Sequence, residues 1–172
     1  MDLTFGMNKD RAMRVYLGLA VLLAIASIAG AWFSELVLGY APCKLCLVQR
    51  WPYYIGIPVG LAALLAGGWS ARSGTVLIWL FVLIFFVSLV LGVYHSGVEW
   101  KWWAGPTDCT GALNNTPMSI EDFRKSLKTV RVVRCDDAAV RVLGLSFAGW
   151  NAIVSAFIIA LPFYGRAPGN NA

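Results

Sequence analysis

With 172 residues, the chain is long enough for a single domain, but its composition excludes an ordinary water-soluble one. Hydrophobic residues make up 59% of the sequence and charged residues 13%, whereas a typical soluble domain has about 25% charged residues. The net charge of +5 does not indicate nucleic-acid binding, because the basic residues are scattered between apolar segments. We therefore expect a protein of the lipid bilayer that binds no nucleic acid.

Four predominantly apolar segments are long enough to cross a bilayer, which takes about 20 residues each. The spans are expected at about 15–34, 46–66, 74–95 and 143–164, with external loops at about 35–45 and 96–142. Because lipid offers the backbone no hydrogen-bond partners, every span should be a helix. The expected fold is all-α: residues 1–172 form one membrane domain, an integral four-helix bundle with a long external loop.

The basic start of the chain resembles a secretory signal, since Lys9, Arg11 and Arg14 precede an apolar run. The apolar region of a signal peptide is only about 7–15 residues long. Here the apolar run continues to Trp32 and Phe33, past the small residues that could mark a cleavage site. We expect a retained span rather than a cleaved signal.

The distribution of charge predicts which side of the membrane each segment faces. The segments expected to be cytoplasmic carry Lys9, Arg11, Arg14, Arg72 and Arg166 with only two acids, which fits the enrichment of Lys and Arg on that side. The loop from Glu99 to Arg141 is a contrary sign, because it holds seven Lys or Arg residues. Six acids nearly neutralise the loop, but the rule for membrane orientation counts only Lys and Arg, so this offset helps little. The length of the loop still favours an external position, so we expect both termini in the cytoplasm.

The four cysteines form a tight pair and a wide pair. Cys43 and Cys46 make a C-x-x-C beside the second span, and Cys109 and Cys135 lie in the second external loop. An even number of spans separates the two pairs, so both face the same side of the membrane. That side should be the external one, where disulfides persist. The arrangement predicts a relay of two exchangeable disulfides.

The C-x-x-C lies where a helix is expected to begin. Pro42 before the first cysteine suits a helix start with the thiols in its first turn. Helical spacing then puts Cys43, Cys46 and Arg50 on one stripe. The helix dipole and the guanidinium should both lower a thiol pKa. Arg50 should stabilise a thiolate or an anionic reduced acceptor at membrane depth, or alternatively extend toward the lipid head groups.

Other roles for the cysteines are less favoured. A c-type haem site requires a histidine directly after the second cysteine, where this chain has Leu47. A four-cysteine zinc site is disfavoured because the second pair lacks a C-x-x-C knuckle, so no metal is expected. Purely structural disulfides are disfavoured because a C-x-x-C bridge closes too short a loop to constrain the unfolded chain.

The only histidine of the chain, His95, lies at the outer end of the third span. It could hydrogen-bond the carbonyl of an electron acceptor near Arg50, or it could lie at the membrane interface with its tip in water. Nearby Glu99 could be solvated or could pair with Lys or Arg. The residues alone leave these alternatives open.

Part of the second external loop has helical periodicity. Ile120, Phe123, Leu127 and Val130 recur at spacings of three and four, and basic residues fill the other faces. This predicts a short amphipathic helix on the outer leaflet of the bilayer. The same stripe would also suit a helix that caps the bundle through protein contacts alone.

Five motifs occur in a fixed order with the four cysteines. They are Pro42-Cys43-x-x-Cys46-x-x-Gln49-Arg50, Tyr94-His95-x-Gly97-Val98-Glu99-Trp100, Gly105-Pro106-x-x-Cys109, Cys135-Asp136, and Gly144-Leu145-Ser146-x-Ala148-Gly149-x-Asn151. Across roughly residues 14–164 this pattern resembles the disulfide bond formation protein B (DsbB) family. The resemblance implies a four-helix bundle in the bacterial inner membrane. It would reoxidise a periplasmic thioredoxin-fold oxidase of the DsbA type and pass the electrons to the quinone pool, as ubiquinone or menaquinone.

The same resemblance implies a role for each cysteine. Cys109 would be attacked by the partner, with Cys135 as its disulfide mate. Cys43 would exchange with that loop pair, and Cys46 would face the quinone. The residues implied to border the quinone ring are Cys46, Arg50 and His95.

Two rival functions remain. A vitamin K epoxide reductase-like protein is also a quinone-coupled four-span bundle, but there the loop cysteines precede a C-x-x-C in the last span. The rival from another class is a membrane scaffold stapled by disulfides, with no turnover. Redox cycling of Cys43 and Cys46 with added quinone would separate an enzyme from such a scaffold.

Overall fold

The computed structural model describes residues 3–106, 135–138 and 140–165. Cys109 and the amphipathic helix expected around residues 120–130 lie outside the described residues, so both stay predictions. The part of the chain that is described is mostly helical.

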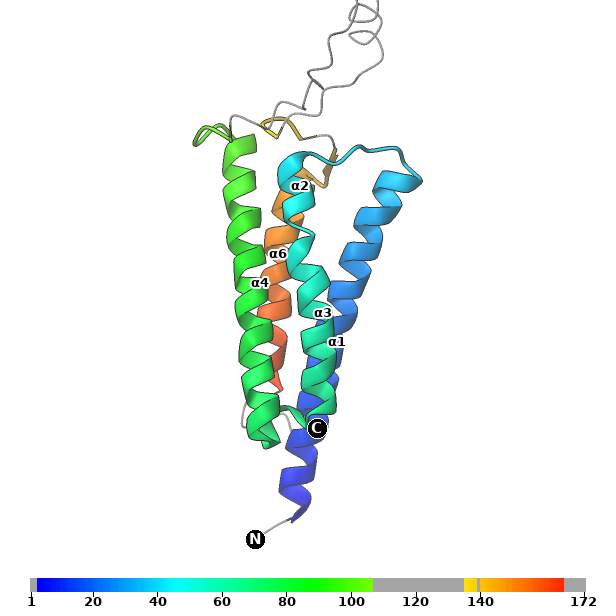
Figure 1. The fold of residues 1–172 in the computed structure, drawn as a ribbon, viewed down its shortest axis with the longest axis vertical. Helices are drawn as coiled ribbons and strands as arrows, with labels where there is room; N and C mark the ends of the chain where they lie inside the picture. Colours follow the sequence, from blue (N-terminus) through cyan, green and yellow to red (C-terminus); the bar gives the residue numbers. More distant parts are fainter. Residues whose placement is uncertain (1–2, 107–134, 139, 166–172) are drawn as a thin grey trace, which may run out of the picture.

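In this part of the chain, four helices run side by side along the long axis: α1 (Leu3–Leu36), α3 (Trp51–Leu65), α4 (Arg72–Glu99) and α6 (Phe147–Tyr164). A short helix, α2 (Lys44–Val48), precedes α3, and a 3₁₀ turn, η1 (Gly68–Ser70), joins α3 to α4. The strands β1 (Arg141–Val142) and β2 (Leu145–Ser146) form an antiparallel hairpin before α6. Figure 1 shows α2 and the hairpin at one end of the helices, whereas α1 begins and α6 ends at the other.

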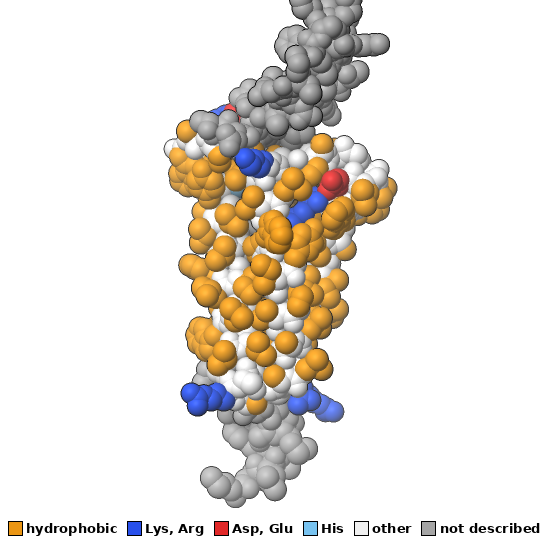
Figure 2. All heavy atoms as spheres, viewed as in Figure 1, with side chains coloured by type: hydrophobic (Ala, Val, Ile, Leu, Met, Phe, Trp, Pro, Cys, Tyr) orange, Lys and Arg blue, Asp and Glu red, His pale blue; other side chains and the backbone are white. Residues whose placement is uncertain are grey.

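The outer surface of the helices is apolar. By length and composition, Arg11–Leu36, Arg72–Glu99 and Phe147–Tyr164 could each cross a membrane. Large side chains such as Leu83 and Phe86 of α4 are more than half exposed. On the face shown in Figure 2, hydrophobic side chains cover the helices between the two ends, and Lys and Arg lie toward the ends. A soluble monomer rarely exposes so continuous an apolar surface, so this is a membrane protein.

The second apolar segment consists of two helices, whereas the sequence predicted one span. α2 ends at Val48 and α3 begins three residues later, with Gln49 and Arg50 in the turn between them. Pro52 lies in the first turn of α3, where its missing N–H needs no partner. In one continuous helix its ring would clash with the carbonyl of Val48, four residues earlier. Cys46 and Arg50 therefore do not share the continuous helical stripe that the spacing predicted.

The last helix begins at Phe147, whereas the sequence predicted a span from about residue 143. Leu143 and Gly144 have positive φ angles of 53° and 84°, as in the two-residue turn of a tight hairpin. The hairpin ends at Ser146, whose hydroxyl caps α6 by accepting a hydrogen bond from the N–H of Gly149 at 3.2 Å. The hairpin thus delays the helix and fixes where its first turn lies.

The core between the helices is filled by apolar side chains. Leu17 and Val21 of α1, Phe81 and Phe85 of α4, and Ile158 of α6 are buried in one cluster. In lipid, this close packing is itself a main source of helix association, since the surrounding tails are as apolar as the side chains. The packing of these apolar side chains fixes the positions of the helices that carry the polar groups.

A chain of hydrogen bonds crosses this core. Tyr53 of α3 donates to Asn151 Oδ1 of α6 at 2.6 Å, and Asn151 Nδ2 donates to the Ser88 carbonyl of α4 at 3.3 Å. The hydroxyl of Ser155 donates to that of Ser88 at 3.0 Å. Polar contacts between apolar helices select which faces meet. The network therefore holds α3, α4 and α6 in one relative arrangement.

A close backbone approach between α4 and α6 depends on Gly92. A Cβ at this position would lie 2.9 Å from the backbone nitrogen of Ala152 and 3.1 Å from the carbonyl oxygen of Ala148. We expect Gly92→Ala to lower the free energy of unfolding by about 1–3 kcal/mol, because backbone would have to move. The measurement is the thermal unfolding midpoint in detergent.

Gly18→Ala in α1 is the matched control. A Cβ there would meet nothing within 4 Å. Because alanine favours a helix more than glycine does, the unfolding midpoint should stay the same or rise. Equal losses from the two substitutions would contradict the close approach of α4 and α6.

Candidate functional site

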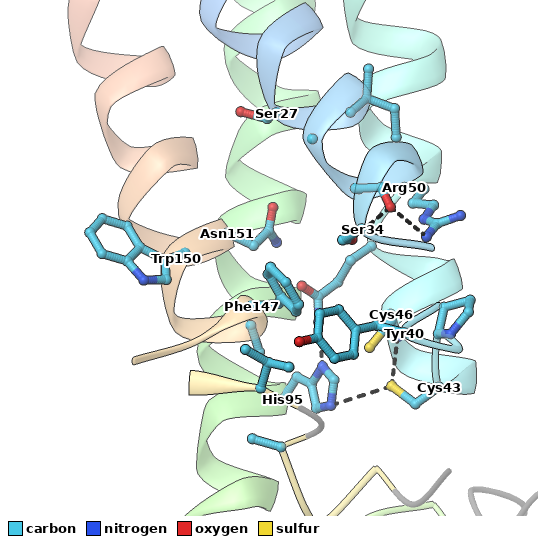
Figure 3. A pocket seen from close by; sticks show the side chains of 18 of the residues that line it. Ser27, Ser34, Tyr40, Cys43, Cys46, Arg50, His95, Phe147, Trp150 and Asn151 are labelled. Atoms are coloured by element: carbon cyan, nitrogen blue, oxygen red, sulfur yellow. Dashed lines mark hydrogen bonds between the residues drawn. The ribbon is translucent and has the colours of Figure 1, made fainter. Parts of the chain in front are cut away.

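A cavity of about 340 Å³ lies at the end of the helices where α2 is found. Its walls come from α1, from α2 and the start of α3, from the end of α4 and from the start of α6. Most of the wall is apolar, and the polar side chains that line it include Tyr53. Figure 3 shows four more of them: Cys46, Arg50, His95 and Asn151. Apolar walls with a few polar groups are typical of a site for a small molecule.

Cys43 caps the short helix α2. Its sulfur accepts a hydrogen bond from the backbone N–H of Cys46 at 3.1 Å, as a serine or aspartate oxygen does at other helix starts. Cys43 is 5% exposed, and both cysteines line the cavity. The predicted helix start after Pro42, with the thiols at its first turn, is confirmed.

His95, near the end of α4, connects the C-x-x-C to its surroundings. Its Nε2 lies 3.7 Å from Cys43 Sγ, and its Nδ1 lies 2.7 Å from the side-chain nitrogen of Gln49. Because the Gln49 NH₂ group only donates, Nδ1 is the acceptor and Nε2 carries the ring proton toward Cys43. His95 is 2% exposed, so the alternative of a ring tip in water does not hold.

Glu99 lies one turn after His95 and is buried with it. Its Oε1 is 3.8 Å from His95 Nε2, and the residue is 9% exposed. Its Oε2 has no hydrogen-bond partner among the described residues. Neither alternative considered for Glu99, solvation or an ion pair with Lys or Arg, is found in this part of the chain. A buried carboxylate oxygen without a partner is costly and often marks a functional site.

The Cys43 thiol is poised to be a thiolate. A hydrogen bond from the Cys46 side chain is the main cause, and a hydrogen bond and charge from His95 add to it. Together they outweigh burial and lower the pKa of Cys43 to about 5. The sequence predicted a lowered thiol pKa but assigned it to the helix dipole and Arg50. The neighbours responsible are instead Cys46 and His95.

Arg50 is held against α1. Its Nη1 donates to Glu35 Oε2 at 2.6 Å, its Nη2 donates to the Ala31 carbonyl at 3.5 Å, and its Cζ lies 5.2 Å from the centre of the Trp32 ring. A charge at membrane depth requires such a partner. Arg50 is buried and lines the cavity, so its side chain does not extend freely toward the head groups.

Cys135 enters the same region from the segment before β1. It is buried in one cluster with Cys43, against Leu45 and Cys46. Cys135 is disulfide-bonded, whereas Cys43 and Cys46 are free, so its partner cysteine lies outside the described residues. A disulfide and a free dithiol are therefore neighbours, as the predicted relay requires.

Sequence reasoning missed the contacts of Glu35, Gln49 and Glu99. Glu35 had an available signal, because a buried arginine needs a counter-charge and this acid ends the first apolar run. Gln49 and Glu99 stood in the motifs but carried no signal of their role. Their contacts depend on where α2 ends, at the C-cap Gln49, and on the burial of the last turn of α4.

Long apolar helices and a C-x-x-C whose first cysteine is buried beside a disulfide cysteine define a class: membrane proteins with thiol–disulfide chemistry. The family model described as Disulfide bond formation protein DsbB matches residues 13–165. The chain therefore belongs to the DsbB family and is a membrane disulfide-forming oxidoreductase.

Three curated relatives match this chain over most of their own length. Disulfide bond formation protein B 1 of Pseudomonas entomophila is 28% identical over 162 residues, covering 92% of this chain and 89% of that protein. Its namesake in Pseudomonas putida is 27% identical over 169 residues and covers 94% of each chain. An uncharacterized protein of Rickettsia prowazekii is 23% identical over 161 residues, covering 92% of this chain and 91% of that one. No solved structure gave a significant match.

The pKa of Cys43 can be measured by ultraviolet thiolate absorption. In reduced Cys109→Ser/Cys135→Ser protein, we expect one thiolate to form with a midpoint near pH 5. Adding Cys46→Ala should raise that midpoint, because the hydrogen bond from the Cys46 side chain is the largest cause of the shift. A midpoint near the ordinary cysteine value of about 8.5 in the parent protein would contradict this account of the dithiol.

Proposed function

We propose that the protein reoxidises a periplasmic thioredoxin-fold oxidase of the DsbA type and passes the electrons to a quinone, either ubiquinone or menaquinone. The main support for this proposal is the position of the C-x-x-C. Cys43 and Cys46 line an apolar cavity and also pack against disulfide-bonded Cys135. One dithiol thus adjoins both a protein disulfide and a space for a small molecule.

We assign the chain to the bacterial inner membrane as a four-helix bundle with both termini in the cytoplasm. α1, α4 and α6 would supply three crossings, and α2 and α3 together, residues 44–65, the fourth. Arg11, Arg14 and Arg72 lie in helix starts at the end opposite Cys43, which agrees with the enrichment of basic residues on the cytoplasmic side. The cysteines would then face the periplasm, where disulfides persist.

The residues of the cavity fit a quinone. The walls are mostly apolar, as an aromatic ring and its tail require. Arg50 has five N–H donors, and its bonds to Glu35 and Ala31 use two of them. Among the described residues the remaining Arg50 donors are available to a carbonyl oxygen, whereas His95 Nε2–H is directed at the Cys43 sulfur. When bound there, the quinone would supply the two-electron oxidation of the dithiol.

Electrons would reach the dithiol through thiol–disulfide exchange. The partner's thiolate attacks Cys109 and releases Cys135, which attacks Cys43 and releases Cys46. The partner's second thiolate then displaces Cys109, and Cys109 displaces Cys43 from Cys135. The partner leaves as a disulfide, the loop disulfide is restored, and Cys43 and Cys46 hold the two electrons as a dithiol.

The described state corresponds to the end of that sequence. Cys43 and Cys46 are free while Cys135 is disulfide-bonded. His95 Nε2–H faces the Cys43 sulfur and would hold its thiolate in place, and Gln49 fixes the ring tautomer. Cys46, which lines the cavity, would then form the disulfide with Cys43 when the two electrons pass to the quinone.

Thiol trapping tests the proposed reaction directly. The Cys109→Ser/Cys135→Ser protein is reduced without oxygen, mixed with quinone and then alkylated. We expect both remaining thiols to become protected while one quinone per chain is reduced. With Cys46→Ala added, Cys43 should stay alkylatable and quinone should not be consumed. Normal quinone turnover by a Cys46→Ala protein would contradict the assignment of Cys46 to quinone reduction.

Arg50 can be tested separately from the cysteines. Arg50→Gln should raise the apparent KM for quinone about tenfold or more, since a charged hydrogen-bond donor is lost from the wall. Glu35→Gln keeps the guanidinium and removes only its partner, so it should change the KM much less. Steady-state kinetics and the thermal midpoint are measured for both variants. If Arg50→Gln leaves the KM unchanged, Arg50 is only an anchor between α1 and α3.

A further inference from the structure

Cys43, Cys46 and His95 have the geometry of a metal site. The two sulfurs and one ring nitrogen all lie within 4.8 Å of one another (Figure 3). Cys43 Sγ and His95 Nε2 are 3.7 Å apart. In a tetrahedral zinc site, a sulfur and a nitrogen ligand are about 3.5 Å apart and two sulfurs about 3.8 Å. Small side-chain movements would bring all three atoms to these distances.

Glu99 lies beside this three-atom group and is the candidate for a fourth ligand, although its oxygens are not within 4.8 Å of all three atoms. Its Oε1 is 3.8 Å from His95 Nε2, and its buried Oε2 has no hydrogen-bond partner among the described residues. An unpaired buried carboxylate oxygen is stabilised by a cation. Two thiolates, one imidazole and one carboxylate suit Zn²⁺ and similar ions, whereas Mg²⁺ and Ca²⁺ prefer oxygen ligands alone.

Gln49 could support such a site from behind the ring. A metal-bound histidine usually donates its other N–H to an acceptor, which fixes the ring orientation. Gln49 contacts His95 Nδ1 at 2.7 Å. If the side-chain amide of Gln49 rotated by 180°, its oxygen would accept a hydrogen bond from His95 Nδ1–H. The lone pair of His95 Nε2 would then be free to bind the cation.

We propose that the reduced C-x-x-C binds one divalent cation of the Zn²⁺ class through Cys43, Cys46 and His95, with Glu99 as the fourth ligand. Binding releases the thiol protons and leaves the oxidation state of both sulfurs unchanged. A Cys43–Cys46 disulfide has no thiolate to offer, so metal binding and disulfide formation exclude each other. The cation is thus a reversible inhibitor of this dithiol and not a cofactor, and the site requires no quinone.

Cobalt is the probe, because Co²⁺ adopts the geometry of zinc and absorbs when thiolates bind it. The reduced Cys109→Ser/Cys135→Ser protein, which keeps only the C-x-x-C, is titrated with Co²⁺ without oxygen. We expect one Co²⁺ per chain, a thiolate-to-cobalt charge-transfer band, the spectrum of a tetrahedral ion, and displacement by Zn²⁺.

Three substitutions in the same background locate the ligands. Cys46→Ser should at least halve the charge-transfer band, because only the Cys43 thiolate remains, and Glu99→Gln should weaken cobalt affinity about tenfold or more. Asp136→Asn is the matched control, because that carboxylate is paired with Lys101 at 2.7 Å and should leave the affinity unchanged. Equal affinities of the Glu99→Gln and parent proteins would overturn Glu99 as a ligand.

The oxidised protein supplies a control that needs no substitution. It should bind no cobalt with thiolate absorption, and reduction should restore binding. A band of equal strength in the oxidised protein, or an octahedral spectrum without thiolate absorption in the reduced one, would overturn the site. The readout is absorption, so a failure of quinone reduction would leave this result untouched.

Discussion

The burial of His95 between the C-x-x-C and the last turn of α4 is the constraint on which the site depends. An imidazole removed from water is costly unless its nitrogens are paired. Cys43 and Gln49 supply those partners from opposite ends of α2. On one continuous helix, residues six apart lie about 120° apart around the axis, so both could hardly reach one ring. Cys43 departs from helical geometry, with extended φ and ψ angles of −73° and 168°, whereas Gln49 keeps helical angles. The extended start of α2 is therefore part of the site.

Charge compensation is divided between two walls of the cavity. The thiolate of Cys43 is stabilised by Cys46 and His95, whereas the guanidinium of Arg50 is balanced by Glu35 on α1. Arg50 therefore lines the same cavity as the dithiol, but its charge is paired with Glu35 and not with a thiolate. The ion pair also joins the end of α1 to the start of α3, which frames one side of the cavity.

Much of this arrangement could be predicted from the sequence, because it follows from local chemistry. Apolar length predicted the long helices, and Pro42 before the C-x-x-C predicted the helix start. The stripe joining Cys46 to Arg50 was wrong because it assumed an unbroken helix, although Pro52 carried the opposing signal. The contacts of Gln49 and Glu99 could not be predicted, since they depend on the packing of α4 against the segment between α2 and α3. Cys109 lies outside the described residues, so its role stays a prediction.

We propose that the cavity beside the C-x-x-C is where a quinone meets the dithiol. Photoaffinity labelling with an azido-quinone, followed by peptide mass spectrometry, tests it most directly. We expect labels on the cavity-lining segments within residues 26–53 and 137–154, and their loss when excess unmodified quinone is present. Labels confined to lipid-facing side chains such as Leu83 and Phe86, or labels that unmodified quinone does not displace, would contradict it.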